Sequence, residues 1–294
     1  MKFGALLPHN VPYQDRRTLV DWCRGIEDGP FETLAVGDRI AYDNLDQIVS
    51  LSAAAVLTTR PKIFLGVTVG PMQPAKLLAK RVASLDVISE GRVVLGLGVG
   101  GRLDDYQAAE RPMERLHGRL DAQVEEMRAV WLGKGVADGT AAIGPMPVQE
   151  GGPPIYASAR GPKSMTRAAR WADGNFGGSM PLSPDLMAIR AEMTRAAWTE
   201  AGRQDSPYLI DAVWFALGPD GEAMIRGAGR RYFENVTLRH GFEWSPDMAP
   251  CSSEDRLRSM VDGYAAAGWD ELVFVPASTD IEQLGRLVDV LQKG

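Results

Sequence analysis

The sequence predicts an α/β fold in which eight strand–helix units close into a barrel, and three observations support it. Short runs rich in Val, Ile and Leu alternate with longer stretches of helical periodicity, which is the pattern of alternating strands and helices. The run KIFLGVTV at 62–69 is apolar on both faces, as a parallel strand covered on both sides must be. The chain has 294 residues, a length that such TIM barrels reach as one domain.

The strands are short apolar runs bounded by Gly, Pro or polar residues. In chain order they are KFGALLP, TLAVGD, KIFLGVTV, RVVLGLG, PIYAS, GNFGG, YLIDAVWFAL and ELVFVPA, which begin at residues 2, 33, 62, 92, 154, 174, 208 and 271. Eight parallel strands are the number that closes this type of barrel. An open, doubly wound sheet with the same alternation is the alternative fold.

Helices are expected between the strands, where apolar residues recur at helical spacing. In the stretch 14–27, for example, Leu19, Trp22 and Ile26 share one face. The expected helices cover 14–27, 45–59, 75–89, 113–132, 161–171, 184–201, 222–236, 254–267 and 281–291. A loop rich in Gly and Pro is expected over 133–152. It does not divide the chain, so residues 1–294 are expected to form a single domain.

Charge and cysteine content exclude several classes of function. The chain has 38 acidic and 32 basic residues, a net charge of −6, whereas a nucleic-acid binder carries a basic face. The two cysteines, Cys23 and Cys251, match no metal or redox spacing. No apolar run reaches the ~18 residues of a membrane span, and Pro8 interrupts the apolar start before it resembles a secretory signal. We therefore expect a cytoplasmic protein without nucleic-acid, membrane or metal partners.

A glycine-rich segment, GLGVGG at 96–101, ends the fourth predicted strand. It contains a literal G-x-G-x-x-G, but a dinucleotide-binding turn also needs a helix that opens directly on the glycines, and RLDDYQAAERP follows without a clean apolar stripe. In a barrel this end of the strand faces the active site. Gly98 and Gly100 would let a flat ring or a sugar approach the backbone there. The other interpretation is a tight turn without a ligand.

Three segments resemble the luciferase-like monooxygenase superfamily. LLAKRVASLDVISEGRVVLGLGVGG at 77–101 is similar to that family's run LAK…ATLD.LS.GR..LG.G.G, and RLHGRLDAQVEEMRAVW at 115–131 to its RG..LDE…I…LW helix. PIYASARGPKSMTRAARWADGNFGG at 154–178 resembles its PI…GP…A…ADG segment. The resemblance implies a barrel that binds FMN or coenzyme F420 at the strand ends, and an oxidoreductase whose chemistry the cofactor ring carries out.

The resemblance also places the cofactor. The end of the third strand matches a bulge with a strained peptide bond behind the ring, and the turn ASARGPK at 157–163 matches the phosphate cradle. Backbone N–H groups at a helix start suit an anion, and Lys163 would add a cation there or be a solvated surface lysine. The candidate cofactor residues are Thr68, Val69, Gly70, Gly98, Gly100, Ser158, Gly161, Lys163, Gly177 and Gly178.

The catalytic candidates are His9, Asp38 and Arg39. Many family members carry a histidine after the second strand, in an Asp–His or Glu–His pair, whereas this chain has Asp38–Arg39. A permanent cation there replaces a group that titrates near neutrality. Arg39 could stabilise the reduced ring, hold an anionic ligand group or pair with Asp38 at the surface. His9, which follows the first strand, is the substitute acid or base, or a plain polar residue.

Three functions stay open. The first is an FMN-dependent monooxygenase served by a separate reductase; the second is an F420-dependent dehydrogenase or reductase, whose branch GPKSMTRAARWADG resembles slightly more; the third is a redox-inactive barrel that binds a ligand or a partner. The small-molecule substrate would contact the variable loops 133–152 and 229–251. Phe233, Phe242 and Trp244 would form an apolar wall there or belong to the core. Members of this family commonly form homodimers, so a homodimer is expected.

Overall fold

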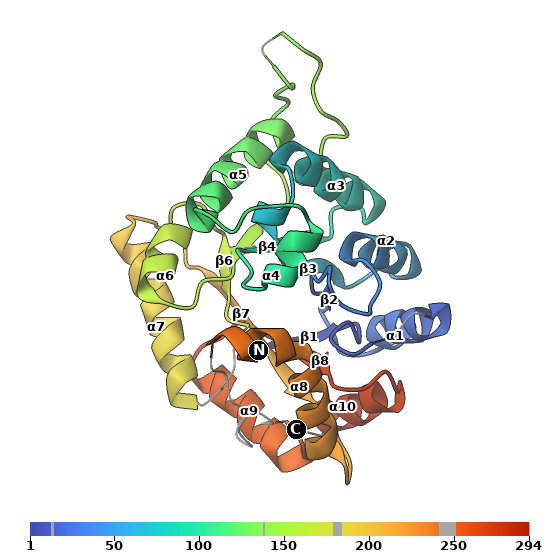
Figure 1. Cartoon of the computed structure of the whole chain (residues 1–294). Coiled ribbons are helices and arrows are strands. Elements are labelled where there is room, and N and C mark those ends of the chain that lie inside the picture. The colour runs from blue at the N-terminus through green and yellow to red at the C-terminus, as the bar shows by residue number, and fades with distance from the viewer. Residues whose placement is uncertain (13–14, 138, 179–183, 241–250, 294) are drawn as a thin grey trace.

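A computed structural model of the chain describes residues 1–12, 15–137, 139–178, 184–240 and 251–293. Eight parallel strands form a closed barrel with helices around it (Figure 1). The strands are β1 (Lys2–Leu6), β2 (Thr33–Val36), β3 (Lys62–Val69), β4 (Val93–Gly98), β5 (Ile155–Ala157), β6 (Gly174–Phe176), β7 (Tyr208–Phe215) and β8 (Glu271–Pro276). The helices are α1 (Arg16–Asp28), α2 (Gln47–Leu57), η1 (Gly70–Met72), α3 (Ala75–Ile88), α4 (Leu103–Ala108), α5 (Leu116–Trp131), α6 (Pro162–Ala168), α7 (Pro184–Glu200), α8 (Gly221–His240), α9 (Glu254–Ala266) and α10 (Glu282–Gln292).

The predicted barrel is confirmed, and the open sheet is wrong, because β8 pairs in parallel with β1 and closes the ring. The interpretation of GLGVGG as a dinucleotide-binding turn is also wrong, because these glycines end the fourth strand of a closed barrel. The helices differ from the prediction in several places, most of them at the ends. The short helix α4 was not predicted, and α5 begins three residues later than expected because Arg115 adopts a left-handed backbone conformation with φ 49°.

Strand side chains alternate between two apolar layers. Those that point inward fill the barrel, so it has a packed core rather than a pore; among them are Leu6, Ala35, Phe64, Val94, Tyr156, Phe176, Ile210, Trp214 and Val273. Those that point outward pack under the helices, with Leu34, Leu65, Leu95, Leu209 and Leu272 in that layer. Within the part of the chain that the structure describes, no helix is both long and apolar enough to cross a membrane.

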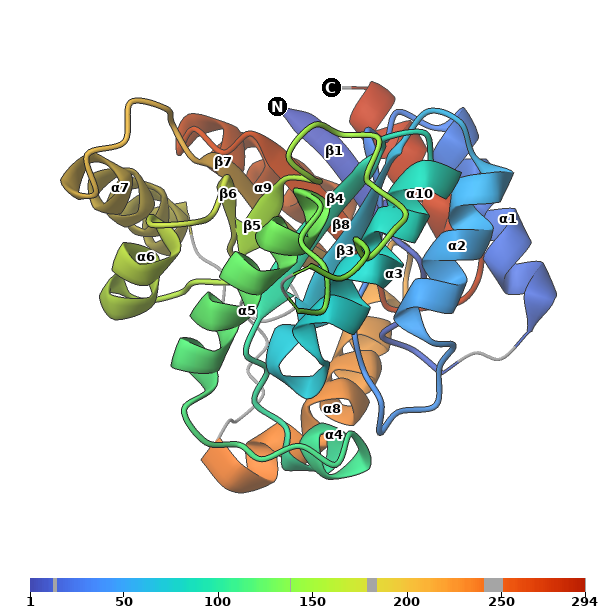
Figure 2. The same cartoon turned by 90° about the horizontal axis from the view of Figure 1, so that it is seen from above.

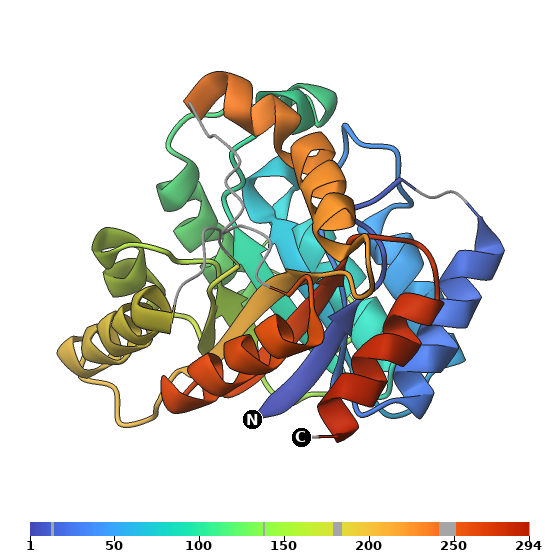
Figure 3. The ribbon, with the colours of Figure 1, turned by 90° about the horizontal axis from the view of Figure 1, so that it is seen from below.

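The carboxyl ends of the strands open at the end of the barrel where α4 and α8 lie, opposite the amino terminus (Figures 2 and 3). We call this end the mouth. The described part of the 133–152 loop joins the end of α5 to the start of β5 and lies against the outer side of α3, where Lys76 and Lys80 donate to the Val136 and Gly144 carbonyls, so it does not line the mouth. Its predicted contact with substrate is therefore wrong. Of the second predicted substrate loop, 229–240 belongs to α8, and Phe242 and Trp244 lie outside the described residues.

Candidate active site at the mouth of the barrel

The turn after β1 buries two polar residues at the mouth. His9 and Asn10 are 0% and 7% exposed, so His9 is not a surface residue. The Nδ2 atom of Asn44 lies 2.7 Å from His9 Nε2 and donates a hydrogen bond to the His9 carbonyl at 3.1 Å. Burial and, to a lesser extent, the positive charge of Arg39 lower the pKa of His9 to about 3. His9 is therefore neutral at physiological pH, which does not suit the acid–base role expected for it.

Asp38 is the mouth residue whose titration falls closest to neutrality. Its pKa is raised to about 6, chiefly by burial. The hydrogen bond that the Val69 N–H donates to Asp38 Oδ2, at 2.9 Å, opposes the shift, and the charges of Asp46 and Asp105 contribute to it. A carboxyl group held near neutrality in a barrel mouth is suited to accept or release a proton at physiological pH.

We expect Asp38→Asn to raise stability at neutral pH at the expense of activity. A raised carboxyl pKa means that the folded state holds the proton more tightly than the unfolded state. The Asp38 contribution to stability is thus lost as pH rises from about 4 to about 6. Thermal or urea denaturation should show the variant and the wild type equal near pH 4, and the variant more stable by ~1–3 kcal/mol near pH 7.5.

The comparison isolates Asp38, because the pKa of buried Asp211 is also raised to about 6 and that group is unchanged in both proteins. Asparagine keeps an oxygen that accepts from the Val69 N–H. Equal stability at both pH values would show that Asp38 is an ordinary solvated carboxylate.

Arg39 is buried in an ion pair with Asp105, which α4 supplies. Their side chains are 3% and 5% exposed, and Arg39 Nε lies 3.2 Å from Asp105 Oδ2. Asp105 Oδ1 also accepts hydrogen bonds from the backbone N–H groups of Ile40 and Ala41, at 3.0 and 2.7 Å. The predicted surface pair between Asp38 and Arg39 is therefore wrong. The acidic partner of Arg39 is Asp105, which lies in a helix that the sequence pattern did not predict.

Tyr232 of α8 contacts the loops after β2 and β4 at the mouth. The guanidinium groups of Arg39 and Arg102 both lie over its ring, with Cζ atoms 5.0 and 4.5 Å from the ring centroid. The Tyr232 carbonyl accepts a hydrogen bond from Arg102 Nη2 at 2.8 Å. Arg39 also stacks on Tyr42 at 4.6 Å, and Trp214 meets Tyr232 edge-on from inside the barrel at 5.7 Å. These contacts hold α8 over the mouth.

The predicted bulge lies at the end of β3, two residues earlier than its candidates. The Gly66–Val67 peptide bond is cis, and the register with β4 shifts between Leu65 and Thr68. The buried Thr68 hydroxyl donates to Gln47 Oε1 on α2 at 2.8 Å. A β-carbon on Gly70 would lie 2.6 Å from Gln123 Oε1 on α5. Thr68 and Gly70 are thus turned toward the helices, and Val67 packs against the barrel interior instead. Sequence alternation missed Val67 because the bulge interrupts it.

Backbone without side chains forms one wall of the mouth. A β-carbon on Gly98 would lie 3.3 Å from both Val67 Cγ2 and Ser158 Cβ, so the ends of β3, β4 and β5 meet there. One on Gly37 would lie 3.8 Å from the Gly66 carbonyl oxygen. Glycine is required at position 100 by the backbone instead, because its φ is 64° and a β-carbon would lie 2.8 Å from Val69 Cγ1. We call the backbone around Gly37, Gly66–Val67 and Gly98 the glycine wall.

The predicted phosphate turn follows β5 at the mouth. The Gly161 N–H donates to Ser164 Oγ at 3.1 Å, which caps the start of α6. Lys163 is exposed. Arg160, which sequence reasoning did not select, donates from Nη2 to the Gly178 carbonyl at 2.6 Å and so links the turns after β5 and β6.

Gly177 and Gly178 end β6 beside this turn. A β-carbon on Gly177 would lie 2.5 Å from the buried Asp211 carboxyl group. Gly178 has a φ of 45°, and a β-carbon there would lie 2.1 Å from the Phe176 ring. Contacts within the chain therefore explain why glycine occupies both positions, without a ligand. Their contact with a phosphate stays a prediction.

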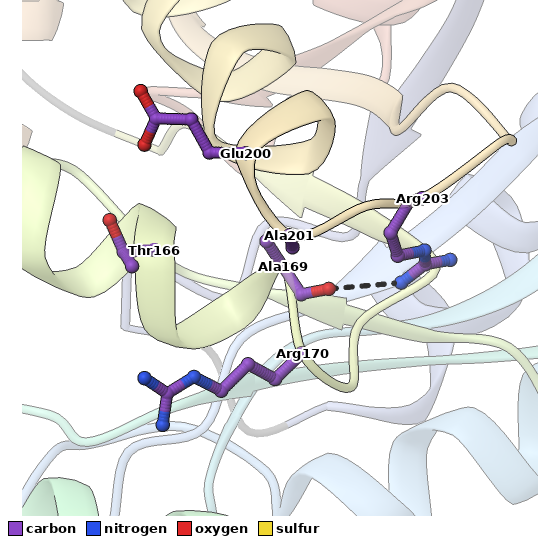
Figure 4. Close-up of a pocket in the computed structure, with 6 residues that line it drawn as sticks. All are labelled: Thr166, Ala169, Arg170, Glu200, Ala201 and Arg203. Carbon is purple, nitrogen blue, oxygen red and sulfur yellow. Dashed lines mark hydrogen bonds between the residues drawn. The ribbon is translucent and has the colours of Figure 1, made fainter.

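A surface groove of about 520 Å³ lies at the far ends of α6 and α7, away from the mouth (Figure 4). Its lining includes Arg170, Glu200 and Arg203. Figure 4 shows the guanidinium groups of Arg170 and Arg203 pointing away from each other. Arg203 instead donates to the Ala172 carbonyl at 2.6 Å and pairs with Asp205. Because its charged groups do not converge, we assign no chemistry to this groove.

Comparison with known proteins identifies relatives over most of the chain. The profile of a family described as luciferase-like monooxygenase matches residues 1–272. The F420-dependent glucose-6-phosphate dehydrogenase of Nocardia farcinica is 34% identical over 251 residues, which cover 74% of this chain and 72% of that protein. An uncharacterized Mycobacterium tuberculosis protein is 31% identical over 173 residues, and the match spans 60% of its length. The F420-dependent hydroxymycolic acid dehydrogenase of the same species is 30% identical over 161 residues, 51% of this chain and 43% of that enzyme.

Solved structures share the fold at lower identity. The monooxygenase RslO1 from Streptomyces bottropensis has a TM-score of 0.82 at 20% identity, with 100% of this chain and 98% of that chain covered. The coenzyme F420-dependent tetrahydromethanopterin reductase from Methanopyrus kandleri has a TM-score of 0.74 at 20% identity, with 99% and 96% covered. At this identity the likeness concerns the fold alone.

Proposed function

The chain belongs to the luciferase-like monooxygenase family, and from this membership and the geometry of the mouth we propose that it is an F420-dependent oxidoreductase. It would transfer hydride between the deazaflavin ring and a small organic substrate. The observation that supports a ring cofactor most is the glycine wall, which presents bare backbone at the ends of neighbouring strands. The relatives named as F420-dependent enzymes favour F420, while the family description keeps FMN and monooxygenation as the second candidate.

The residues present fit such a cofactor. A flat ring can approach the backbone closely at glycines, and Gly37, Gly66 and Gly98 lie at or near the ends of three consecutive strands. It also needs polar partners at its edge. His9 Nδ1 and Asn10 Oδ1 are buried without a hydrogen-bond partner among the described residues, and both residues lie beside Gly37 of that wall. The phosphate would meet the turn at 157–163, where Arg160 adds a cation. When bound, the ring supplies the hydride donor or acceptor.

The chain's own residues would orient the ring, exclude water and handle a proton. Helix α8 covers the mouth through Tyr232, which keeps solvent from the reacting atoms. Asp38 is the group we assign to proton transfer, because its pKa of about 6 lies closest to neutrality. Arg39 would contribute less fixed charge than a lone cation, because Asp105 balances it. A separate enzyme that recycles the cofactor, and a homodimeric assembly, belong to this proposal as well.

Fluorescence titration with F420 and with FMN tests the proposal. We expect saturable quenching with F420 at low micromolar concentration. FMN, which also carries a ring and a phosphate, should bind more weakly, because the relatives with a named cofactor are F420-dependent. Tighter binding of FMN would support the monooxygenase candidate instead. Saturation by neither cofactor at high micromolar concentration would contradict both and favour a redox-inactive, ligand-binding barrel.

A further inference from the structure

Two buried polar atoms in the turn after β1 have no hydrogen-bond partner among the described residues. They are His9 Nδ1 and Asn10 Oδ1, on consecutive residues of the turn after β1. Most buried polar side-chain atoms in folded proteins are paired, so each exception calls for a reason. Here Asn10 Oδ1 and the His9 ring lie beside Gly37 of the glycine wall. A β-carbon on Gly37 would lie 3.7 Å from His9 Cδ2 and 3.8 Å from Asn10 Oδ1.

The contacts of Asn44 fix which nitrogen of His9 carries the proton. Asn44 Nδ2 faces two atoms of His9 at once, the ring Nε2 at 2.7 Å and the carbonyl oxygen at 3.1 Å. A carbonyl oxygen only accepts, so the Asn44 amide must present its NH₂ group to this position. His9 Nε2 then accepts a hydrogen bond from that group, and in a neutral imidazole the proton lies on Nδ1.

His9 is also held in the neutral form. Burial and the positive charge of Arg39 both lower its pKa, to about 3. His9 Nδ1 is consequently a hydrogen-bond donor throughout the physiological pH range. Asn10 Oδ1, as an amide oxygen, is an acceptor at every pH.

We propose that His9 and Asn10 form a fixed donor–acceptor pair that binds the lactam edge of the cofactor ring. The ring carbonyl would accept from His9 Nδ1, and the adjacent ring N–H would donate to Asn10 Oδ1. FMN, riboflavin and F420 all carry such an edge. This inference rests on the proposed function for the identity of the ligand. It makes His9 a recognition residue rather than a carrier of protons.

The tautomer can be measured without any ligand. The chain has three histidines, so ¹⁵N-histidine labelling gives few signals, and the signal missing from His9→Gln identifies His9. We expect Nδ1 protonated and Nε2 unprotonated from pH 5 to 8 in the wild type. Asn44→Leu should lose this preference, because the donor to Nε2 is removed. Titration of wild-type His9 near neutrality, or a proton on Nε2, would overturn the proposal.

Two substitutions of His9 separate recognition from packing. Asparagine places an amide N–H close to the position of Nδ1, whereas glutamine places its amide near Nε2. Fluorescence titration should show His9→Gln and Asn10→Leu binding FMN and riboflavin about tenfold more weakly than the wild type, the scale of one lost hydrogen bond. His9→Asn should stay within about threefold. The preference for FMN over riboflavin should be unchanged, because the phosphate lies elsewhere.

Unchanged affinities in His9→Gln and Asn10→Leu, with cofactor binding by the wild type intact, would overturn this inference alone. Failure of the wild type to bind any of the cofactors would instead remove the proposed function, and the lactam assignment with it. Thermal denaturation of each variant shows whether a loss of affinity reflects a loss of folded protein.

Discussion

Replacing Arg39 by alanine is expected to lower the free energy of unfolding by ~3–5 kcal/mol. The change leaves the Asp105 carboxylate buried without its cation, since the two side chains are only 3% and 5% exposed. It also removes the guanidinium that contacts the rings of both Tyr42 and Tyr232, and with it a contact that holds α8 over the mouth. Urea denaturation measures the change. Because Asp105 keeps two backbone N–H donors, the lower end of the range is the expected value.

Two variants serve as controls for this prediction. Asp105→Asn in the Arg39→Ala background should recover part of the lost stability, because no buried charge is left unpaired. Arg17→Ala breaks an exposed ion pair with Asp21, whose side chains are 91% and 39% exposed, and should change stability by less than about 1 kcal/mol. If the free energy of unfolding of Arg39→Ala lay within about 1 kcal/mol of the wild-type value, the Arg39–Asp105 pair would be solvated.

Gly98→Val is expected to abolish saturable cofactor binding while a cooperative fold remains. A β-carbon at this position already approaches Val67 and Ser158 to 3.3 Å, so the valine methyl groups must project from the wall where the ring is proposed to lie. Overpacking of this kind lowers stability by ~1–3 kcal/mol, which a barrel of this size tolerates. Fluorescence titration measures the binding, and thermal denaturation confirms the fold.

Gly101→Val provides a matched control from the same glycine run. Among the described residues, no atom lies within 4 Å of a β-carbon at Gly101, so this variant should bind cofactor as the wild type does. If Gly98→Val bound F420 or FMN within about threefold of the wild type, the glycines at the end of β4 would be no more than a tight turn.

Local periodicity predicted the barrel because each strand and helix buries a face of its own. The run at 62–69 is apolar on both sides and became β3, and the stripe of Leu19, Trp22 and Ile26 became the buried face of α1. Helix α4 was not predicted, because only Asp105 and Tyr106 of its six residues are buried, and so short a pattern shows no helical period.

The candidate site was predictable only where it depends on the position of strand ends. His9 and Asp38 follow directly from the ends of β1 and β2. The partner of Arg39 could not be predicted in this way, because Asp105 lies far along the chain on an unpredicted helix. The orientation of Thr68 and Gly70 was not predictable either, because the bulge at Gly66–Val67 changes which side chains face the mouth. Tyr232 meets the mouth only because α8 folds back over it.

A crystal structure of the chain with F420 or FMN bound tests the central claim most directly. The account predicts that the ring lies against Gly66–Val67 and Gly98, with its lactam edge within hydrogen-bond distance of His9 and Asn10. The phosphate should point toward the turn at 157–163. A cofactor bound in the groove between α6 and α7, or a ring lying outside the mouth above Tyr232, would contradict it.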